Sequence, residues 1–154
     1  SAIVRVTGLS AGTTTPYKVA VDGKEVPIQA NAMIKTPPSD GKVQTRIVFG
    51  TCPHRWGLGN EKQADAILSR KPNAMLIYGD VAVQNRRNNL GLVRADYALR
   101  DFHPAWQKLA AAIPVYASWD DHDYYDNDAS GLPEGCTEEQ RKEIRKVFDT
   151  SWNN

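Results

Sequence analysis

The sequence has no long apolar run, no long run of basic residues and little cysteine. Its apolar segments are all shorter than the roughly 18 residues that a membrane-spanning helix needs. Nineteen basic residues against eighteen acidic ones give a net charge of +1, without the basic stripe that contacts nucleic-acid backbones. The sequence therefore predicts no membrane span and no nucleic-acid binding. Its 154 residues have room for one domain, or for a small module attached to part of a larger domain.

Cysteine is scarce, and its positions follow no known metal-binding or redox spacing. Cys52 and Cys136 are far apart and form neither a CxxC motif nor a zinc ribbon. They could pair, but nothing in the sequence requires a disulfide, so the redox compartment stays open. The chain begins at Ser1, without an initiator methionine or a signal peptide. We expect both ends to be cut from a longer protein.

Several catalytic motifs are also absent. A cysteine phosphatase places an arginine at a fixed distance beyond its nucleophile, and the corresponding position after Cys52 is Leu58. Residues 57–60 lack the lysine and hydroxyl group of a nucleotide-binding loop, and no Gly-x-Ser-x-Gly motif occurs. His122-Asp123 is also the dipeptide of helical HD-type phosphohydrolases, but here it follows a strand-like segment. These classes are therefore disfavoured.

Residues 1–36 show the alternation of apolar and polar side chains that is typical of β-strands. Strand-like runs occur at residues 3–6, 17–21 and 26–28. Asp22-Gly23 separates the second run from the third, and this pair favours the positive φ angles of a tight hairpin turn. Three short strands cannot cover their own apolar face. We therefore predict that they are the last strands of a small β-sandwich domain.

Residues 37–44 break all regular structure and predict a domain linker. Beyond this linker, strand-like segments alternate with segments of helical periodicity. The strands are predicted at residues 46–50, 74–78 and 114–119, and the helices at residues 60–71, 90–112 with a break at Pro104, and 137–152. Such alternation predicts an α/β fold with a largely parallel sheet.

Residues that can bind metal or transfer protons follow all three predicted strands of this region. Cys52 follows the first strand, Asp80 the second and Asp120–Asp123 the third. The carboxyl ends of the strands in an open α/β sheet lie at one edge, where ligands bind, so we expect these segments to meet. Adjacent ionisable side chains repel one another and lose hydration unless a cation offsets their charge. The sequence therefore predicts a metal site.

Each of these residues also has a purely structural interpretation. Asp80 could cap the following turn, and Asp120–Asp123 could be a solvated acidic loop. Cys52 could be a small buried apolar residue, so ligation and packing are equally open. The sequence assigns no catalytic role to His54 or His103. Alignment at one sheet edge nevertheless favours the metal site over the solvated loop.

The segments around these residues leave further alternatives open. Residues 85–89 could contact a phosphate group or form a solvated polar loop. Tyr124 and Tyr125 could line a pocket or pack under the next loop. Cys136 lies in a turn-rich stretch and is expected to be an incidental thiol.

Three motifs resemble those of the alkaline phosphatase D family, which belongs to the calcineurin-like metallophosphoesterases. In order, they are Phe49-Gly50-Thr51-Cys52, Tyr78-Gly79-Asp80 and Trp119-Asp120-Asp121-His122-Asp123. The family places a small fibronectin- or immunoglobulin-like β-sandwich before its catalytic domain, which agrees with the strand signals in residues 1–36. The resemblance implies that residues 45–154 are the first half of a metallophosphoesterase α/β sandwich, and that the chain is an amino-terminal fragment.

The resemblance further implies a dinuclear metal centre. Asp80 would bridge two metal ions, Asp121 would bind the second ion, and Cys52 would complete the shell of the first, with Asp120 as a further ligand. The metals would be iron and calcium, or other divalent ions such as zinc or manganese. The family usually has a tyrosine at the position of Val83, so this departure weakens the preference for iron.

The activity implied by the resemblance is hydrolysis of a phosphate monoester or diester by a metal-activated hydroxide. His122 would assist the leaving group, and Asp123 would orient its imidazole. The resemblance also implies a periplasmic or secreted protein. Two alternatives remain. One is a non-catalytic metal- or ligand-binding module with the same metallophosphoesterase-like fold, and the other is an interaction domain built on the β-sandwich.

The predicted site is incomplete. No histidine follows His122, so we expect the remaining ligands in a missing C-terminal half of the same protein. The chain alone should then be inactive. Part of its apolar surface should also be uncovered, including the last helical stripe of Ile144, Val147, Phe148 and Trp152.

Overall fold

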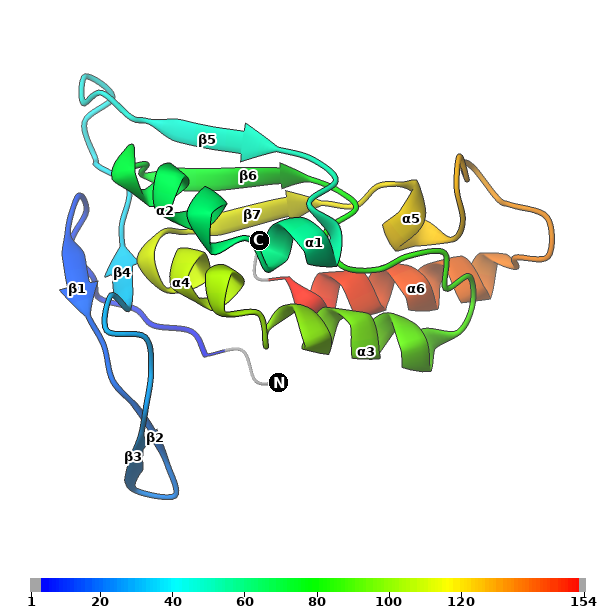
Figure 1. Ribbon diagram of the computed structural model, residues 1–154, viewed down its shortest axis with the longest axis horizontal. Helices are drawn as coiled ribbons and strands as arrows, with labels where there is room; N and C mark the ends of the chain where they lie inside the picture. Colours follow the sequence, from blue (N-terminus) through cyan, green and yellow to red (C-terminus); the bar gives the residue numbers. More distant parts are fainter. Residues whose placement is uncertain (1–3, 153–154) are drawn as a thin grey trace.

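Three parallel strands form the central sheet. The computed structural model describes residues 4–152 and, within that range, all side chains except those of residues 55 and 56. The sheet has the order β5-β6-β7, with strands at Ile47–Gly50, Ala74–Tyr78 and Val115–Ser118. Its register places Phe49 beside Leu76, and Leu76 beside Tyr116. The predicted parallel α/β sheet is therefore confirmed (Figure 1).

Helices follow the strands in the order that the sequence predicts. Within residues 4–152 they are α1 (His54–Leu58), α2 (Glu61–Ser69), α3 (Leu90–Arg100), α4 (Pro104–Ala112), α5 (Asp121–Tyr124) and α6 (Glu138–Ser151). The predicted break at Pro104 is a change of helix, because a proline fits the first turn of a helix but not its interior. None of these helices is both long and apolar enough to cross a membrane.

Polar side chains fix where three of the helices begin. The side-chain oxygen of Asn60 accepts a hydrogen bond from the main chain of α2, and that of Asn89 does the same for α3. Thr137 and Gln140 form a reciprocal capping box at the start of α6. Each cap satisfies an amide that the helix itself leaves unpaired, so these boundaries are encoded locally.

One face of the sheet is covered by helices. In the main core, Ile77 of β6 packs with Trp106 of α4 and with Phe148 and Trp152 at the end of α6. A second cluster fixes α2 against α4 and consists of Ala64, Ala105, Leu109 and Ile113. The expectation that the stripe of α6 is partly uncovered is wrong, because its four apolar side chains are at most 6% exposed. Val147, Phe148 and Trp152 pack in the main core with the sheet and with α3, which lies beside α6 (Figure 1). Ile144 packs with Tyr124, Tyr125 and Cys136.

The other face of the sheet is open. It presents Ile47, Phe49, Tyr78 and Tyr116, which are 49%, 73%, 51% and 44% exposed. Their neighbours along the strands point to the covered face, as the alternation of a β-strand requires. Single exposed apolar residues are ordinary, but a contiguous patch is typical of a surface that another segment covers.

Residues 14–35 form two separate antiparallel ribbons. β1 (Thr14–Pro16) pairs with β4 (Met33–Lys35), and β2 (Val19–Val21) pairs with β3 (Lys24–Val26). The predicted hairpin turn is confirmed, since Asp22 and Gly23 have φ angles of 51° and 76°. The hairpin projects from the body of the molecule (Figure 1).

The strand predicted at residues 3–6 is wrong where it can be examined. Residues 4–6 form no strand, and Ile3 lies outside the described residues. β4 contacts α4, and in the segment between β3 and β4 Asn31 donates a hydrogen bond to the main-chain oxygen of Lys108 and Gln29 donates one to Gln107. Two ribbons of three-residue strands are not by themselves a sandwich, so the β-sandwich stays a prediction.

Candidate metal centre

The three strand ends are tied together by hydrogen bonds. The amide of Cys52, after β5, donates to the main-chain oxygen of Gly79, after β6, over 3.3 Å. The amide of Asp80 donates to Asp123 Oδ2, after β7, over 2.6 Å. The Thr51 hydroxyl adds a bond of 2.6 Å to the main-chain oxygen of Tyr78. The predicted convergence of the segments after β5, β6 and β7 is therefore present.

Gly79 allows β6 and β7 to end this close together. Its φ angle of 76° lies in the left-handed region that side chains disfavour. A Cβ atom at this position would lie 2.2 Å from Asp120 Cβ, well inside van der Waals contact. The glycine in Tyr78-Gly79-Asp80 is thus required both by the backbone conformation and by the neighbouring strand end.

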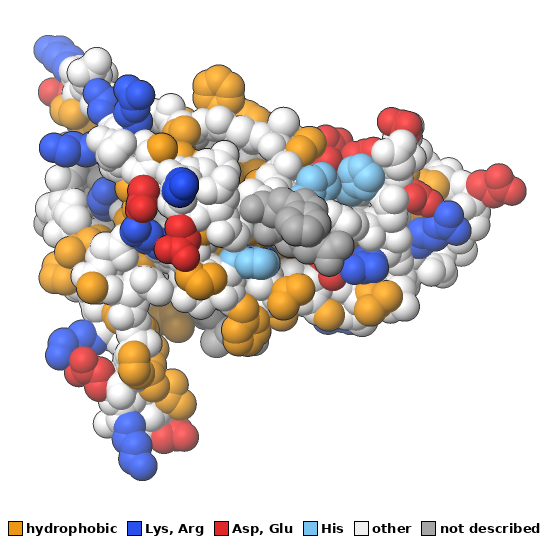
Figure 2. Space-filling model, viewed as in Figure 1, with side chains coloured by type: hydrophobic (Ala, Val, Ile, Leu, Met, Phe, Trp, Pro, Cys, Tyr) orange, Lys and Arg blue, Asp and Glu red, His pale blue; other side chains and the backbone are white. Residues whose placement is uncertain are grey.

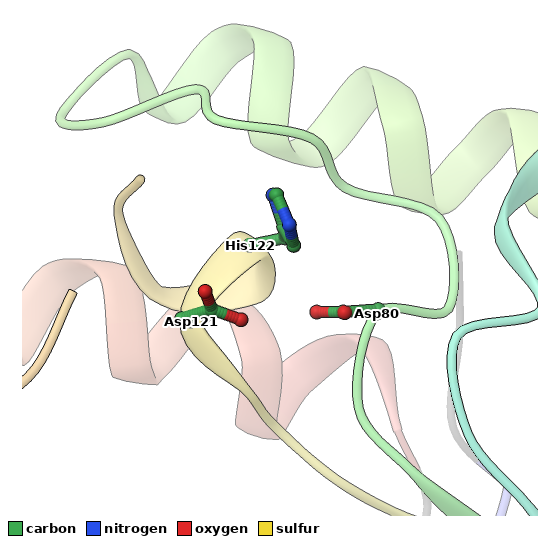
Figure 3. A group of neighbouring side chains, drawn as sticks. All are labelled: Asp80, Asp121 and His122. Carbon is green, nitrogen blue, oxygen red and sulfur yellow. The ribbon is translucent and has the colours of Figure 1, made fainter. Parts of the chain in front are cut away.

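Asp80, Asp121 and His122 form one group at this edge of the sheet. Each offers a ligand atom that lies within 4.8 Å of those of the other two. Figure 3 shows the two carboxylates pointing toward one another, with the imidazole beside them. Asp80 follows β6, and the other two residues begin the short helix α5. Oxygen and imidazole nitrogen donors at this spacing suit a divalent cation.

The surroundings of Asp80 fit a metal ion. The Asp80 side chain is only 5% exposed, and Oδ1 has no hydrogen-bond partner among the described residues. A buried carboxylate oxygen without a partner is unfavourable, because its lost hydration is not replaced. A cation held between Asp80 and Asp121, with His122 beside it, would supply that missing interaction.

Two further residues predicted as ligands lie beside this group. Cys52 Sγ is 3.2 Å from Asp80 Oδ2, on the side of β5. The hydrogen bond with Thr51 lowers the pKa of the Cys52 thiol, but the hydrogen bond to Asp80 and burial raise it above its ordinary value. Asp120 Oδ1 accepts a hydrogen bond from the Asp121 amide, which caps α5. In the described part of the chain, the group of three includes neither Cys52 nor Asp120.

Asp123 lies beneath the group instead of beside the imidazole. Its side chain is 1% exposed, and it accepts hydrogen bonds from the amides of Asp80 and Asp120 and from the Tyr97 hydroxyl. Burial raises the pKa of Asp123 to about 6, although these three hydrogen bonds lower it. Asp123 therefore holds the ends of β6 and β7 together, whereas the expected contact was with the His122 ring.

The ring of His122 pairs with Asn85, which the sequence left among the residues of an unassigned polar loop. The bond joins His122 Nδ1 and Asn85 Oδ1. His54, to which the sequence assigned no role, also lies here, with its ring centroid 5.9 Å from that of His122. Figure 2 shows two adjoining histidine side chains next to acidic side chains on this part of the surface. The only sequence signal for these contacts is the position of the polar loop after a strand end.

Val83 lies in the main core. It is 1% exposed and belongs to the same cluster as Ile77 and Trp106. A valine has no ligand atom, so this position contributes nothing to the metal centre. The departure from the family's usual tyrosine therefore has a packing role here.

The parallel sheet, with a candidate Asp/His metal site at its carboxyl edge, defines an α/β fold. No protein-family model matches the sequence, and no curated protein matches it significantly. Among solved structures, one titled "Structure of PhoD" matches with a TM-score of 0.68 and 19% identity. The match covers 94% of this chain and 31% of that one. The chain therefore has a PhoD-like fold.

Proposed function

We propose that the protein is a metal-dependent phosphoesterase. The observation that carries this proposal is the buried Asp80 carboxylate, which faces Asp121 and His122 and has one oxygen without a partner among the described residues. The PhoD-like fold supports the same reaction class, because the three sequence motifs resemble those of the alkaline phosphatase D family. The substrate would be a phosphate monoester or diester.

Two bound metal ions would supply an activated water molecule and offset the negative charge of the phosphate oxygens. Asp80 would bridge the ions, and Asp121 would bind the second. As the oxygen of water bonds to phosphorus, the bond from phosphorus to the leaving oxygen breaks. His122 in its protonated form would give the Nε2 proton to that oxygen, so the alcohol leaves neutral, and the proton released by the water molecule would restore the imidazolium through solvent. Cys52 and Asp120 would be further ligands of the two ions, and Asp123 would be a positioning residue.

The donor set is compatible with several metals. A thiolate at Cys52 and an imidazole favour iron or zinc, whereas carboxylates alone suit calcium or manganese. An iron and calcium pair, or other divalent ions, would fit this mixed set. Val83 provides no phenolate, which weakens the case for iron.

We further propose that a C-terminal half of the same protein supplies the remaining ligands. The open apolar face of the sheet, with Phe49 and Tyr78 more than half exposed, supports a covering segment. The chain also spans 31% of the PhoD structure that it matches. By the resemblance to the alkaline phosphatase D family, such a protein would be periplasmic or secreted, with a β-sandwich preceding the catalytic domain.

A non-catalytic metal- or ligand-binding module is the second candidate. The burial of Val83 favours it, because a side chain that ligates metal in the family is replaced here by one that packs in the core. The presence of His122 favours the enzyme, since a binding module has little need of a proton donor. Metal analysis and turnover of the full-length protein separate the two: a binding module would hold metal without metal-dependent hydrolysis.

The 154-residue chain alone is expected to bind metal weakly and to lack phosphatase activity. Cys52, Asp80, Asp121 and Asp120 offer too few donors for two cations. Adding a separately expressed segment from farther along the same protein should restore metal-dependent hydrolysis of nitrophenyl phosphate esters. A monomeric chain that folds cooperatively and is active with added metal would contradict the proposal of an incomplete site.

Replacing His122 with alanine in the full-length protein is expected to lower turnover of an alkyl phosphate ester by about 100-fold, the effect of removing a proton-transfer group. Metal content, measured by elemental analysis, should stay close to that of the wild type. A nitrophenyl ester serves as the control, because its good leaving group hardly needs protonation and should be affected much less. Equal losses on both esters, together with lost metal, would make His122 a ligand instead.

A further inference from the structure

Two imidazoles lie together at the candidate metal centre. The rings of His54 and His122 meet edge to face, with an interplanar angle of 76°. His54 begins α1, and its amide donates a hydrogen bond of 3.1 Å to the main-chain oxygen of Asp80. The backbone that carries His54 is thus tied to the same strand end that presents Asp80. The function proposed above uses only one of the two rings.

Consecutive residues of one loop contact the two rings. Gln84 Nε2 lies 3.2 Å from His54 Nδ1, and the next residue, Asn85, pairs through Oδ1 with His122 Nδ1. An amide nitrogen can only donate, so Nδ1 of His54 accepts and the proton of its neutral ring is on Nε2. An amide oxygen can only accept, so Nδ1 of His122 carries a proton. With the two amides in these orientations, the neutral rings of His54 and His122 would be opposite tautomers.

The loop is anchored to α3 and to the segment after α5, so the side-chain amides of Gln84 and Asn85 are held in place. Arg86 makes a bidentate ion pair with Asp96 of α3, with N–O distances of 2.6 and 3.0 Å. Arg87 pairs with Asp126 over 2.7 Å, and its amide donates to the main-chain oxygen of Tyr125. A bidentate arginine–carboxylate pair restrains the orientation of the guanidinium group as well as its position.

The opposite tautomers give the two rings different chemistry. His54 presents Nε2–H, a fixed hydrogen-bond donor, which suits a negatively charged oxygen. His122 keeps a proton on Nδ1, which leaves Nε2 as the atom that exchanges its proton or binds a cation. With a cation bound at Asp80 and Asp121, the Nε2–H group of His54 would suit an oxygen of the phosphate group that the proposed function requires.

We propose that His54 is a further binding residue of the site, which donates a hydrogen bond from Nε2 to a phosphate oxygen, and that Gln84 and Asn85 are positioning residues for the two imidazoles. This inference rests on the proposed phosphoesterase function. It adds a residue pair that sets which nitrogen of each ring faces the substrate.

The tautomers can be measured without metal or turnover. Nitrogen NMR of the ¹⁵N-histidine-labelled, metal-free full-length protein gives one pattern for each ring, and single His54→Gly and His122→Gly variants identify the two rings. We expect the uncharged ring of His122 to carry its proton on Nδ1 and that of His54 to carry it on Nε2. The reverse assignment for either ring would overturn the positioning roles.

Asn85→Gly tests the positioning of His122. Glycine tolerates the φ angle of 50° at this position, so the variant removes the amide without straining the backbone. We expect a mixture of His122 tautomers and a kcat for the full-length protein about 10-fold lower at unchanged KM, the usual effect of losing such a partner. Asn85→Asp, which keeps the acceptor, should restore the Nδ1–H tautomer. Asn88→Gly is the matched control, because its exposed side chain makes no hydrogen bond in the described part of the chain.

His54→Gly tests the binding role with inorganic phosphate as the probe. In the metal-loaded full-length protein, the phosphate dissociation constant should rise about 10-fold, since one charge-assisted hydrogen bond is lost. Metal content should be unchanged, and the matched control His103→Gly should leave phosphate binding unchanged. Unaltered phosphate binding in His54→Gly would overturn the binding role. Failure of the proposed function has a different signature, namely no metal-dependent hydrolysis by the wild type, and leaves the tautomer measurement able to decide the positioning roles.

Discussion

Replacing Asp80 with asparagine is expected to abolish metal-dependent hydrolysis and to remove the stabilisation that metal gives the full-length protein. Metal ions contribute several kcal/mol of transition-state stabilisation, so kcat/KM should fall by about 1000-fold or more. With metal at about 1000 times its dissociation constant, binding stabilises the wild type by about 4 kcal/mol. In the variant this gain should disappear.

The measurement is the melting temperature with and without metal, together with metal content. A stabilisation of about 4 kcal/mol corresponds to roughly 10 °C for a domain of this size. The metal-free melting temperature should hardly change, because asparagine keeps the shape of aspartate and tolerates its φ angle of 53°. Asp22→Asn is the matched control, since Asp22 has a φ angle of 51° in an exposed turn far along the chain from the site. A variant that still gains stability from metal would exclude Asp80 as the bridging ligand.

Replacing Gly79 with alanine is expected to destabilise the protein by about 3 kcal/mol. Two effects add at this position: the left-handed backbone disfavours any Cβ atom, and the new atom would overlap Asp120 where β6 and β7 converge. The melting temperature should fall by roughly 10 °C. Metal affinity should fall as well, because relief of the overlap moves Asp80 away from Asp121.

Gly91→Ala provides the matched control for this substitution. Gly91 lies in the first turn of α3, and an added Cβ atom would meet only Asn89 Oδ1 at the ordinary distance of 3.5 Å. Alanine is favoured over glycine in a helix, so this variant should be neutral or up to about 1 kcal/mol more stable. If Gly79→Ala melts within two or three degrees of the wild type, roughly the effect of 1 kcal/mol, the close approach of the two strand ends does not constrain the site.

Much of the fold follows from local patterns. Each strand of the sheet is a short apolar run, and α2, α3 and α6 each begin at a side-chain cap that the local sequence provides, as Thr137 and Gln140 do for α6. The turn at Asp22-Gly23 and the helix start at Pro104 have the same origin, because one residue's backbone preference decides them. The convergence of Asp80 and Asp121 also follows, since parallel strands end at one edge.

The N-terminal region could not be predicted in the same way. Strands of three residues carry too little periodicity to decide which pairs with which. The β2–β3 hairpin follows from its turn at Asp22-Gly23, but β1 pairs with β4 through a contact between separated segments that a sequence pattern does not rank. Burial of the α6 stripe was likewise missed, because it depends on how α3, the sheet and the segment around Tyr124 and Tyr125 pack on it, not on the stripe itself.

The sequence by itself determined the alternation of strands and helices, and the carboxylates and imidazole that follow strands β6 and β7. Only the tertiary structure decided the partners of those side chains. His122 contacts Asn85, which is 37 residues away, and Asp123 contacts main-chain amides and Tyr97 in place of the imidazole. The physical reason is that the end of a strand fixes where a residue lies, but not which partners its side chain meets. Those partners depend on the conformation of the loops after β5 and β6, which contain residues at positive φ. Those conformations, at Cys52, Asp80 and Asn85, are stabilised by contacts between distant segments.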